Sequence, residues 1–504
     1  MVINENDYRN LCACADRIFK EATVDDGLIA TPYMHIIRAH PVLLEKYAPI
    51  LAGTGIKQRR NLKQIVASLH SLAARHGISF TSRAGGQGIA DIGPSITTPD
   101  FLFVSHLLKP DQANNEPDLY FGDLPNNLHR SGFSVAISYV NQTTHDVRQL
   151  TGQWANDGVT RYLVGRTCAP NEARDCLDQM AATASALESL ASGNSGNPLY
   201  ASFCKAAAND ARSNTTWVNL AIGRNFRELL SHIKPKVVIF THEGHAWERV
   251  ICAETNRQAP SAVRAGYIHA ALFDTQHCLF TELPLTYHPD KVFTTGKLAL
   301  EQLRDRTYFL ADQAAILGTH KITRSTAIAG DKQNDCLVLP EGLVEECRYL
   351  FGCSLALARK HPHVRFVWRL HPILSFDTLT AAYPEFRNLP ANIELSGNSF
   401  EHDISRSKWA LYRGSTAIVQ ALAGGVQPLY MRQPGGLDVD PLHQLYAWKK
   451  IIDHPGMLDS VFMPDKSGET DNLSLAEAKK FVDRFYEPFR QVALTELLSG
   501  KYVN

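Results

Sequence analysis

The stretch KWALYRGSTAIVQALAGGVQPLYM, residues 408–431, holds a strand, a helix and a second strand in quick succession. Residues 408–412 are apolar and β-prone, and residues 426–431 repeat that composition. Between them, Ser415 and Thr416 are typical of the first residues of a helix. Two strands joined by a helix are predicted to lie parallel in one sheet, with a right-handed crossover.

The same alternation extends along most of the chain. Strands are predicted at 335–340, 364–370 and 392–396 in the second half, and at 100–108, 133–140, 236–242, 263–270 and 291–296 in the first half. Helices are predicted at 217–233, 246–257, 343–360 and 415–423, with a long amphipathic helix at 474–499. This pattern is typical of α/β proteins with doubly wound parallel sheets.

The chain is too long for one ordinary core. With 504 residues, two large domains or three small ones are expected, since domains usually hold roughly 100–200 residues. Residues 306–333 are polar and weakly periodic, which favours a linker. We therefore predict one Rossmann-like domain at 1–305, with a helical segment over its first ninety residues, and a second at 334–504 that ends in the long helix. The two domains are expected to face a central cleft.

Composition excludes several classes of protein. Hydrophobic residues make up 44% and charged residues 20% of the chain, as in soluble globular proteins. Lys+Arg and Asp+Glu both total 51, so no overall positive charge would attract nucleic acid. We find no apolar window long enough to cross a bilayer and no signal-peptide pattern, which predicts a cytoplasmic protein. The ten cysteines form no CxxC pair and are predicted to be reduced core thiols.

The pair His371-Pro372 stands out among five His-Pro pairs because it directly follows a predicted strand, 364–370. Open parallel sheets bind ligands at the carboxyl ends of their strands. Pro372 restricts the backbone of the turn, and Arg369 lies two residues before the histidine. We predict that this turn contacts a ligand.

A second predicted contact follows strand 408–412. Helix capping alone would explain Ser415 and Thr416. However, Gly414 would let a ligand approach the backbone, the helix N-terminus would attract an anion, and Arg413 would add a positive charge. These features predict a phosphate site. Two further residues, in the turn after strand 335–340, are expected at the same sheet edge: Glu341 and Gly342.

In the first half, FTHEGHAWER (240–249) nearly spells the zinc-protease motif HExxH. Ala246 occupies the position where the second His would be needed, so we reject the zinc interpretation. Glu243 remains as a candidate general base at a strand end, although an ordinary helix-start carboxylate would also explain it. Three histidines nearby are weaker candidates for acceptor contacts: His242, His245 and His269.

The acid-Gly turn, the His-Pro turn and the Ser-Thr helix start, in that order, resemble the three short motifs of bacterial sialyltransferases and Kdo transferases. Those families share the GT-B architecture of two Rossmann-like domains and use CMP-activated 2-keto acid sugars. The likeness extends over roughly residues 230–430. The stretch GLIATPYMHIIRAHP (27–41) and the overall length also resemble bacterial surface carbohydrate biosynthesis proteins.

The resemblance implies roles for single residues. Glu243 would be the base, His371 and Pro372 would contact the CMP phosphate, and Ser415 with Thr416 would be the phosphate-binding hydroxyl pair. It also implies that the domain at 1–305 binds the acceptor and the domain at 334–504 binds the nucleotide sugar. The sugar's carboxylate would be met by an arginine, either Arg369 or Arg413.

One position departs from the sialyltransferase motif, which has two acids before its Gly, because His242 stands at the first of them here. A sialic acid, another nonulosonate and Kdo therefore all stay open as the donated sugar.

The implied function is a CMP-sugar-dependent glycosyltransferase of capsule, lipopolysaccharide or O-antigen biosynthesis, with no cofactor and no metal. Its acceptor would be a surface polysaccharide or a lipid-linked glycan, and a lipid-linked acceptor would imply loose attachment to the inner membrane face. Two alternatives remain, a CDP-glycerol-type phosphotransferase on a GT-B frame and a non-catalytic scaffold of a polysaccharide assembly complex.

Overall fold

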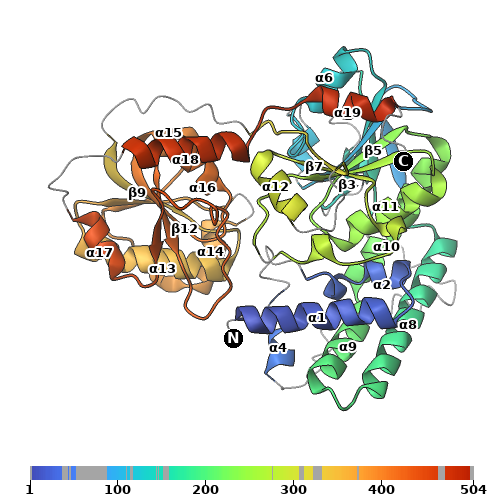
Figure 1. Ribbon diagram of the computed structural model, residues 1–504, viewed down its shortest axis with the longest axis horizontal. Coiled ribbons are helices and arrows are strands. Elements are labelled where there is room, and N and C mark those ends of the chain that lie inside the picture. Colours follow the sequence, from blue (N-terminus) through green and yellow to red (C-terminus); the bar gives the residue numbers. More distant parts are fainter. Residues whose placement is uncertain are drawn as a thin grey trace. The chain divides into compact units, whose positions relative to one another are not determined.

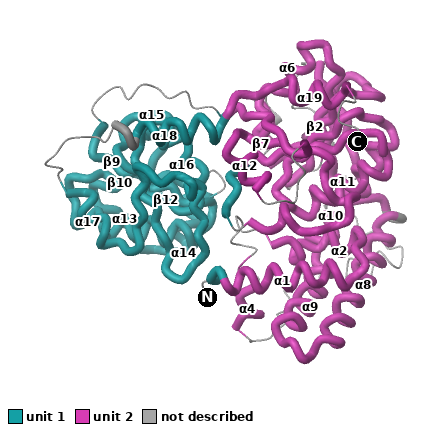
Figure 2. Tube along the Cα trace, in the orientation of Figure 1, with its two compact units in different colours: residues 1–5, 270–275, 321–486 teal, residues 6–269, 276–320, 487–504 magenta. Residues whose placement is uncertain are grey.

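The computed structural model describes residues 3–36, 44, 47–52, 88–108, 110–113, 117–143, 145, 147–150, 158–274, 276–305, 312–321, 332–371, 374–463 and 472–499. The chain forms two compact units (Figure 2). Unit 1 comprises residues 1–5, 270–275 and 321–486, and unit 2 comprises residues 6–269, 276–320 and 487–504.

Unit 2 contains an eight-stranded sheet in the order β1-β4-β3-β2-β5-β6-β7-β8, which Figure 1 shows surrounded by helices. All neighbouring strands are parallel except β1 and β4. The strands are β1 (Ile89–Ile92), β2 (Phe101–Leu107), β3 (Val135–Asn141), β4 (Thr160–Val164), β5 (Val237–Thr241), β6 (Val263–Ile268), β7 (Lys291–Thr294) and β8 (Ala314–Ile316).

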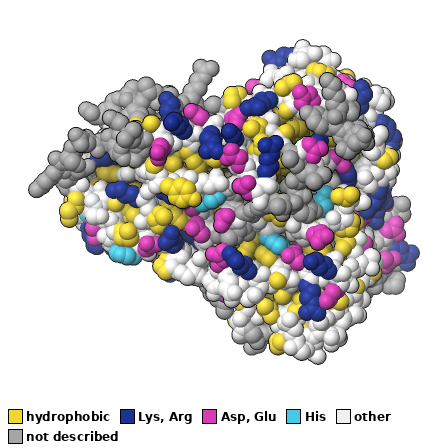
Figure 3. All heavy atoms as spheres, in the orientation of Figure 1, with side chains coloured by type: hydrophobic (Ala, Val, Ile, Leu, Met, Phe, Trp, Pro, Cys, Tyr) yellow, Lys and Arg dark blue, Asp and Glu magenta, His cyan; other side chains and the backbone are white. Residues whose placement is uncertain are grey.

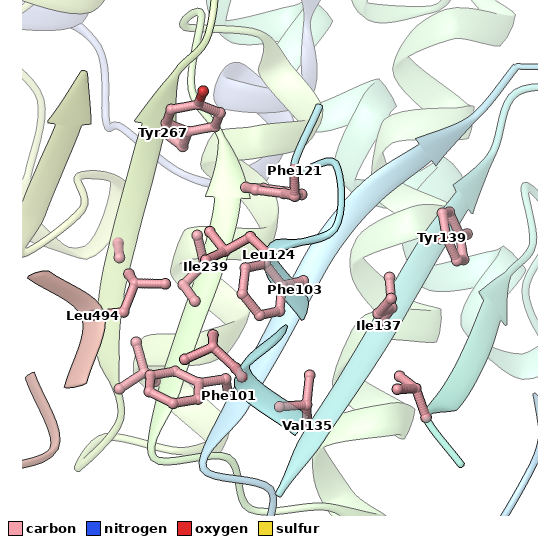
Figure 4. Close-up of a cluster of buried hydrophobic side chains, with 14 of the residues drawn as sticks. Phe101, Phe103, Phe121, Leu124, Val135, Ile137, Tyr139, Ile239, Tyr267 and Leu494 are labelled. Carbon is pink, nitrogen blue, oxygen red and sulfur yellow. The ribbon is translucent and has the colours of Figure 1, made fainter. Parts of the chain in front are cut away.

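Alternate residues of β2 pack on opposite faces of this sheet, as the two-residue period of a strand requires. Phe101 and Phe103 join a cluster that includes Leu494 of the C-terminal helix (Figure 4). Leu102 and Val104 pack in a second cluster with residues of two helices on the other face. The helices are α6 (Leu124–Arg130) and α19 (Gln491–Leu498) on the first face, and α10 (Asn214–His232) and α11 (Ala246–Gln258) on the second.

A helical layer packs beside this sheet in unit 2. Arg257 of α11 binds Asp26 of this layer through two hydrogen bonds of 2.6 and 2.7 Å, which tie the N-terminal segment to the sheet domain. The layer contains α1 (Glu5–Glu21), α2 (Asp26–Ala30), α8 (Pro170–Gly193) and α9 (Pro198–Ala211). Shorter elements of unit 2 are η1 (Pro32–Met34), α4 (Ala48–Leu51), η2 (Pro110–Ala113), α7 (Val147–Leu150), η4 (Cys278–Phe280), η5 (Leu285–Tyr287) and α12 (Lys297–Asp305).

Unit 1 contains a six-stranded parallel sheet in the order β11-β10-β9-β12-β13-β14. Its core includes Trp368, whose ring stacks on Phe351 at 4.2 Å and whose indole N–H donates to Ser354. The strands are β9 (Gln333–Leu339), β10 (Arg365–Trp368), β11 (Ile393–Leu395), β12 (Ser407–Tyr412), β13 (Gln427–Met431) and β14 (Lys450–Ile452). The helices are α13 (Val344–Lys360), α14 (Phe376–Ala382), η6 (Pro384–Arg387), α15 (Phe400–Arg406), α16 (Ala417–Ala423), α17 (Met457–Phe462) and α18 (Asn472–Phe485).

The predicted α/β fold class is confirmed: the chain has two Rossmann-like doubly wound units, and helices at its N-terminus. Each strand predicted from the sequence is present. Strands β1, β4, β8 and β14 were not predicted. Part of the predicted N-terminal helical segment, residues 53–87, lies outside the described residues.

The C-terminal region differs from the prediction. Instead of one helix at 474–499, the chain forms α18 and α19, separated by an extended segment that contains Pro488. This segment pairs with unit 2, since the backbone N–H of Thr319 donates to the Glu487 carbonyl at 2.7 Å. Residues 487–504 therefore belong to unit 2 and not to the domain predicted at 334–504. Within the predicted linker 306–333, residues 314–316 form β8, a strand of the unit 2 sheet.

The surface and the cysteines agree with the composition. On the face shown in Figure 3, basic and acidic side chains are interspersed. All ten cysteines are free and nine of them are buried. Among the described residues, no helix has the length and hydropathy of a membrane span.

Candidate functional site

The strand order of unit 2 places its topological switch point between β2 and β5. From β2 the chain winds outward through β3 to β4, and it then crosses to β5 and winds the other way through β6 and β7. Doubly wound sheets bind their ligands at the carboxyl ends of the two strands that flank such a point. Glu243 is the second residue after β5, so this candidate lies where the topology predicts a ligand.

Glu243 lies close to two histidines, and the three residues are called here the Glu243 cluster (Glu243, His245 and His269). Its Oε2 atom lies 3.1 Å from Nε2 of His245, and its Oε1 atom lies 3.7 Å from Nε2 of His269, the residue after β6. Burial would lower the pKa of His245, but the hydrogen bond with Glu243 raises it above its ordinary value. The Glu243 side chain keeps 19% exposure, so the cluster can meet a ligand.

Glu248, in the first turn of α11, holds this cluster in place. Its Oε2 atom accepts hydrogen bonds from the backbone N–H groups of Glu243, Gly244 and His245, each at 2.9 Å. Burial raises the pKa of Glu248 to about 7, although His245 opposes this effect. Glu248 was not predicted from the sequence as a site residue. An acid at the third helical position is typical of a capping box, and this pattern could have identified it.

Gly244 is required in this turn for two reasons. Its φ angle is +88°, in the left-handed region that favours glycine. In addition, a Cβ atom at this position would lie 2.7 Å from Sγ of Cys278. The thiol of Cys278 also donates to the Glu243 carbonyl at 2.9 Å. The turn is therefore fixed both by Glu248 and by the segment that contains Cys278.

Two rings that were not predicted from the sequence lie near the Glu243 cluster, those of Tyr120 and His106. The ring of Tyr120, from the loop after β2, packs edge-on against His269 at 4.5 Å and lies 5.4 Å from the ring of His106 in β2. Asp118 shapes this loop by accepting from the backbone N–H of Tyr120 at 2.9 Å. Burial, together with the nearby His245, lowers the pKa of His106 to about 3. The neutral ring of His106 contacts Thr241 at 3.3 Å.

His242 is placed differently from the other predicted acceptor residues. Its side chain is 1% exposed and lies against the backbone of Gly266, where an added Cβ would come 2.9 Å from the His242 Cβ. Burial and the nearby Arg249 lower the pKa of His242 far below its ordinary value. A ring with this burial has no surface to offer an acceptor. Among the described residues, no group of His, Cys, Asp and Glu side chains is arranged to hold a metal ion.

The switch point of unit 1 lies between β9 and β12. Three parallel strands end side by side at this edge in the order β10-β9-β12. The residues that follow these three strands include all the predicted donor contacts: Arg369, His371 and Pro372 after β10, Glu341 and Gly342 after β9, and Arg413 to Thr416 after β12.

The hydroxyl groups of Ser415 and Thr416 make no side-chain hydrogen bond to another described residue, and both residues are partly buried. Helix α16 begins at Ala417 and has only seven residues, so its dipole contributes less than a long helix would. Arg413 does not present its charge to this edge as expected. Its guanidinium group is buried and pairs with Glu346 at 3.3 Å.

The residues after β10 are arranged around Arg369. Its guanidinium group donates to the buried carboxylate of Asp403 at 2.8 Å and lies over the ring of Phe400, so much of its charge is already balanced within unit 1. His371 is exposed, and its carbonyl accepts from the backbone N–H of Leu374 at 2.9 Å. Pro372 lies outside the described residues.

No family model and no curated protein matches this chain. Three solved structures show weak similarity in fold. The glycotransferase of kitacinnamycin aligns with a TM-score of 0.45 at 12% identity, covering 81% of this chain and 100% of its own. The UDP-GlcNAc 2-epimerase from Neisseria meningitidis bound to UDP-GlcNAc gives 0.45 at 13% identity, covering 80% and 100%. The calicheamicin glycosyltransferase CalG4 gives 0.46 at 12% identity, covering 80% and 98%. Because each TM-score is below 0.5, we transfer no donor, acceptor or reaction from these proteins to this chain.

Proposed function

We propose that this protein is a glycosyltransferase that moves a 2-keto acid sugar, a sialic acid-like nonulosonate or Kdo, from a CMP-sugar to a hydroxyl group of a surface polysaccharide or lipid-linked glycan. The observation that carries the proposal is the Glu243 carboxylate beside the His245 imidazole at the switch point of unit 2. Glycosyl transfer to a hydroxyl group needs a base near the acceptor oxygen, and a partly exposed carboxylate at a strand end is suited to that task.

The edge of unit 1 supports the donor half of the proposal. As the bond from the anomeric carbon to the phosphate oxygen breaks, its electron pair stays on the phosphate and the sugar becomes oxocarbenium-like. Fixed hydrogen-bond donors at the phosphate stabilise this transition state more than the ground state. We assign this task to the Ser415 and Thr416 hydroxyls and to His371. The acceptor oxygen then bonds to the anomeric carbon, and Glu243 takes its proton.

Both arginines at this edge of unit 1 already have carboxylate partners. Arg413 is paired with buried Glu346, and Arg369 is paired with buried Asp403. We therefore assign phosphate recognition to hydroxyl and imidazole groups, and we keep Arg369, with 28% side-chain exposure, as the candidate for the sugar's carboxylate.

Donor turnover tests this function. The purified protein is incubated with CMP-sialic acid, CMP-Kdo or CDP-glycerol, and release of CMP is measured with and without a glycan acceptor. We expect CMP release from one of the two CMP-sugars. Consumption of CDP-glycerol alone would instead identify a phosphotransferase, and no turnover or binding of any of the three would favour the non-catalytic scaffold.

Two variants test the assignments within this function. Glu243→Gln is expected to lower kcat by about 10²–10⁴, whereas Glu282→Gln, which alters an exposed carboxylate of the same unit, should leave kcat unchanged. Unchanged transfer by Glu243→Gln would remove Glu243 as the base. His371→Ala is expected to weaken CMP binding, and equal affinity in the variant would contradict the phosphate contact.

A further inference from the structure

Glu341 occupies an unusual place at the switch point of unit 1. It follows β9 by two residues, and its side chain lies directly over Gly414, the residue before the Ser415-Thr416 pair. A Cβ atom on residue 414 would overlap the carboxyl group of Glu341. Gly414 was expected to make room for a ligand, but in this structure it makes room for the Glu341 carboxyl group.

The charges around Glu341 are unbalanced. The single guanidinium group of Arg413 faces two carboxyl groups, those of Glu341 and Glu346. Arg413 is already held by Glu346 at 3.3 Å and by the Leu437 carbonyl at 3.2 Å, and both members of the ion pair are buried. A second negative charge in this place would have no counter-charge of its own among the described residues that act on it.

The local environment therefore favours the neutral acid at position 341. Burial and then the charge of Glu346 raise the pKa of Glu341 to about 8, although Arg413 opposes the shift. Helix α13 contributes two groups near Glu341: the carboxyl group of Glu346 and the thiol of Cys347, which donates to the Glu341 carbonyl at 3.8 Å. Burial also raises the pKa of Cys347, so that thiol stays neutral and adds no charge.

We propose that Glu341 serves the nucleotide site as a carboxylic acid, donating a hydrogen bond to the donor phosphate held at Ser415 and Thr416. This inference rests on the proposed function and names a hydrogen-bond donor that it did not include. A protonated carboxyl group has one O–H donor, whereas a carboxylate can only accept and would repel a phosphate. The expected consequence is a phosphate affinity that is present at neutral pH and is lost as pH rises through about 8.

The test compares Glu341→Gln and Glu341→Ala with the parent by calorimetric titration with CMP at pH 6.5 and pH 9. The amide of Gln has nearly the same size as the acid, donates a hydrogen bond and does not titrate. We expect Glu341→Gln to bind CMP as the parent does at pH 6.5 and to keep that affinity at pH 9. The parent should lose about tenfold at pH 9, because only about a tenth of the molecules keep the proton one unit above a pKa of about 8. Glu341→Ala, which has no hydrogen-bond donor at this position, should bind CMP weakly at both pH values.

The outcomes separate this inference from the function on which it rests. If the parent binds CMP and Glu341→Gln has lost binding at pH 6.5, the residue acts as a carboxylate acceptor, and only this inference is overturned. If the parent binds no CMP at either pH, the proposed function and the phosphate contact both fail.

A ligand-free measurement checks the acid state itself. The infrared difference spectrum between the parent and Glu341→Gln at pH 7 should contain the carbonyl band of a protonated carboxyl group. A carboxylate band in its place would overturn the inference. Glu385→Gln, which alters an exposed carboxylate of the same unit, is the control and should lose only a carboxylate band.

Discussion

The carboxylate of Glu243 lies 3.1 Å from the imidazole of His245, two residues further along the same turn. A backbone that turns sharply at Gly244 is what lets these side chains meet, with φ of +88°. The geometry of the proposed base is therefore a property of the turn as much as of the carboxylate.

Replacing Gly244 by Ala should disturb both stability and activity. The added Cβ would strain the left-handed backbone and press on Cys278, so we expect a loss of about 2–4 kcal/mol in the free energy of unfolding. Gly132→Ala is the matched control, because Gly132 has a similar φ of +91° but no atom within 4 Å of an added Cβ. Denaturant unfolding of both variants separates backbone strain from steric overlap. Equal losses in the two variants would show that the contact with Cys278 contributes nothing.

Removing the Glu248 side chain should also destabilise the turn that holds Glu243. Glu248→Ala would leave three backbone N–H groups without their acceptor, and each such group costs about 1–3 kcal/mol when it stays buried. We expect a loss of at least 2 kcal/mol in the free energy of unfolding and lower kcat with little change in donor KM. Full activity in a folded Glu248→Ala variant would contradict the positioning role.

Glu248 also predicts the pH dependence of stability. Its pKa is raised from the ordinary 4.5 to about 7 in the folded protein, so the folded state binds more protons than the unfolded state between these values. Its contribution to stability therefore falls as pH rises from about 4.5 to 7. The difference in unfolding free energy between the parent and Glu248→Gln, measured at pH 5 and pH 7.5, should shrink accordingly. A difference that is the same at both pH values would contradict the assigned pKa shift.

Tyr120 should affect the acceptor and leave the donor unaffected. Its ring packs against His269 and lies next to His106 at the switch point of unit 2, where we propose that it contacts an acceptor sugar. Tyr120→Ala is expected to raise the acceptor KM about tenfold, with unchanged CMP affinity, because stacked rings contribute about 0.5–1.5 kcal/mol. Tyr120→Phe keeps the ring and should behave as the parent. If the Phe variant is as defective as the Ala variant, the hydroxyl group and not the ring is what matters.

The hydroxyl pair of unit 1 should affect the donor. Ser415→Ala combined with Thr416→Val removes two donors from the predicted phosphate site, and each charge-assisted hydrogen bond contributes about 1.5–3 kcal/mol. We expect CMP affinity to fall at least tenfold in a calorimetric titration, with no change in melting temperature, since neither hydroxyl is bonded to another described residue. Ser460→Ala, at an exposed serine of unit 1, is the control. A lower melting temperature with intact CMP binding would assign the pair to helix capping alone.

How much the sequence reveals depends on how local the signal is. Alternating apolar strands and helices are encoded within windows of ten to twenty residues, and the predicted strands of both sheets were found in place. The missed strands β8 and β14 have three residues each, too short for a periodic pattern. The single helix predicted at 474–499 is broken because the backbone at 487 pairs with Thr319, far away in the chain.

The residues at strand ends were also predictable, because parallel strands bring their carboxyl ends to one edge wherever they lie in the sequence. Glu243, His371, Ser415 and Thr416 were each predicted partly because they follow a predicted strand. Their partners were not predictable. The sequence does not distinguish an arginine that faces solvent from one whose charge is neutralised by a buried glutamate. The structure shows that Arg413 pairs with Glu346.

By itself, then, the sequence determined that this protein has two largely parallel α/β sheets and which turns follow their strands, since periodicity and turn chemistry act between near neighbours. Only the tertiary structure decided which side chains from distant segments lie in contact. Tyr120 beside His269 and Glu341 over Gly414 each join segments that are far apart in the chain and that only the fold brings together. Burial in those contacts sets which groups carry charge, because a low-dielectric surrounding penalises every charge that lacks a partner.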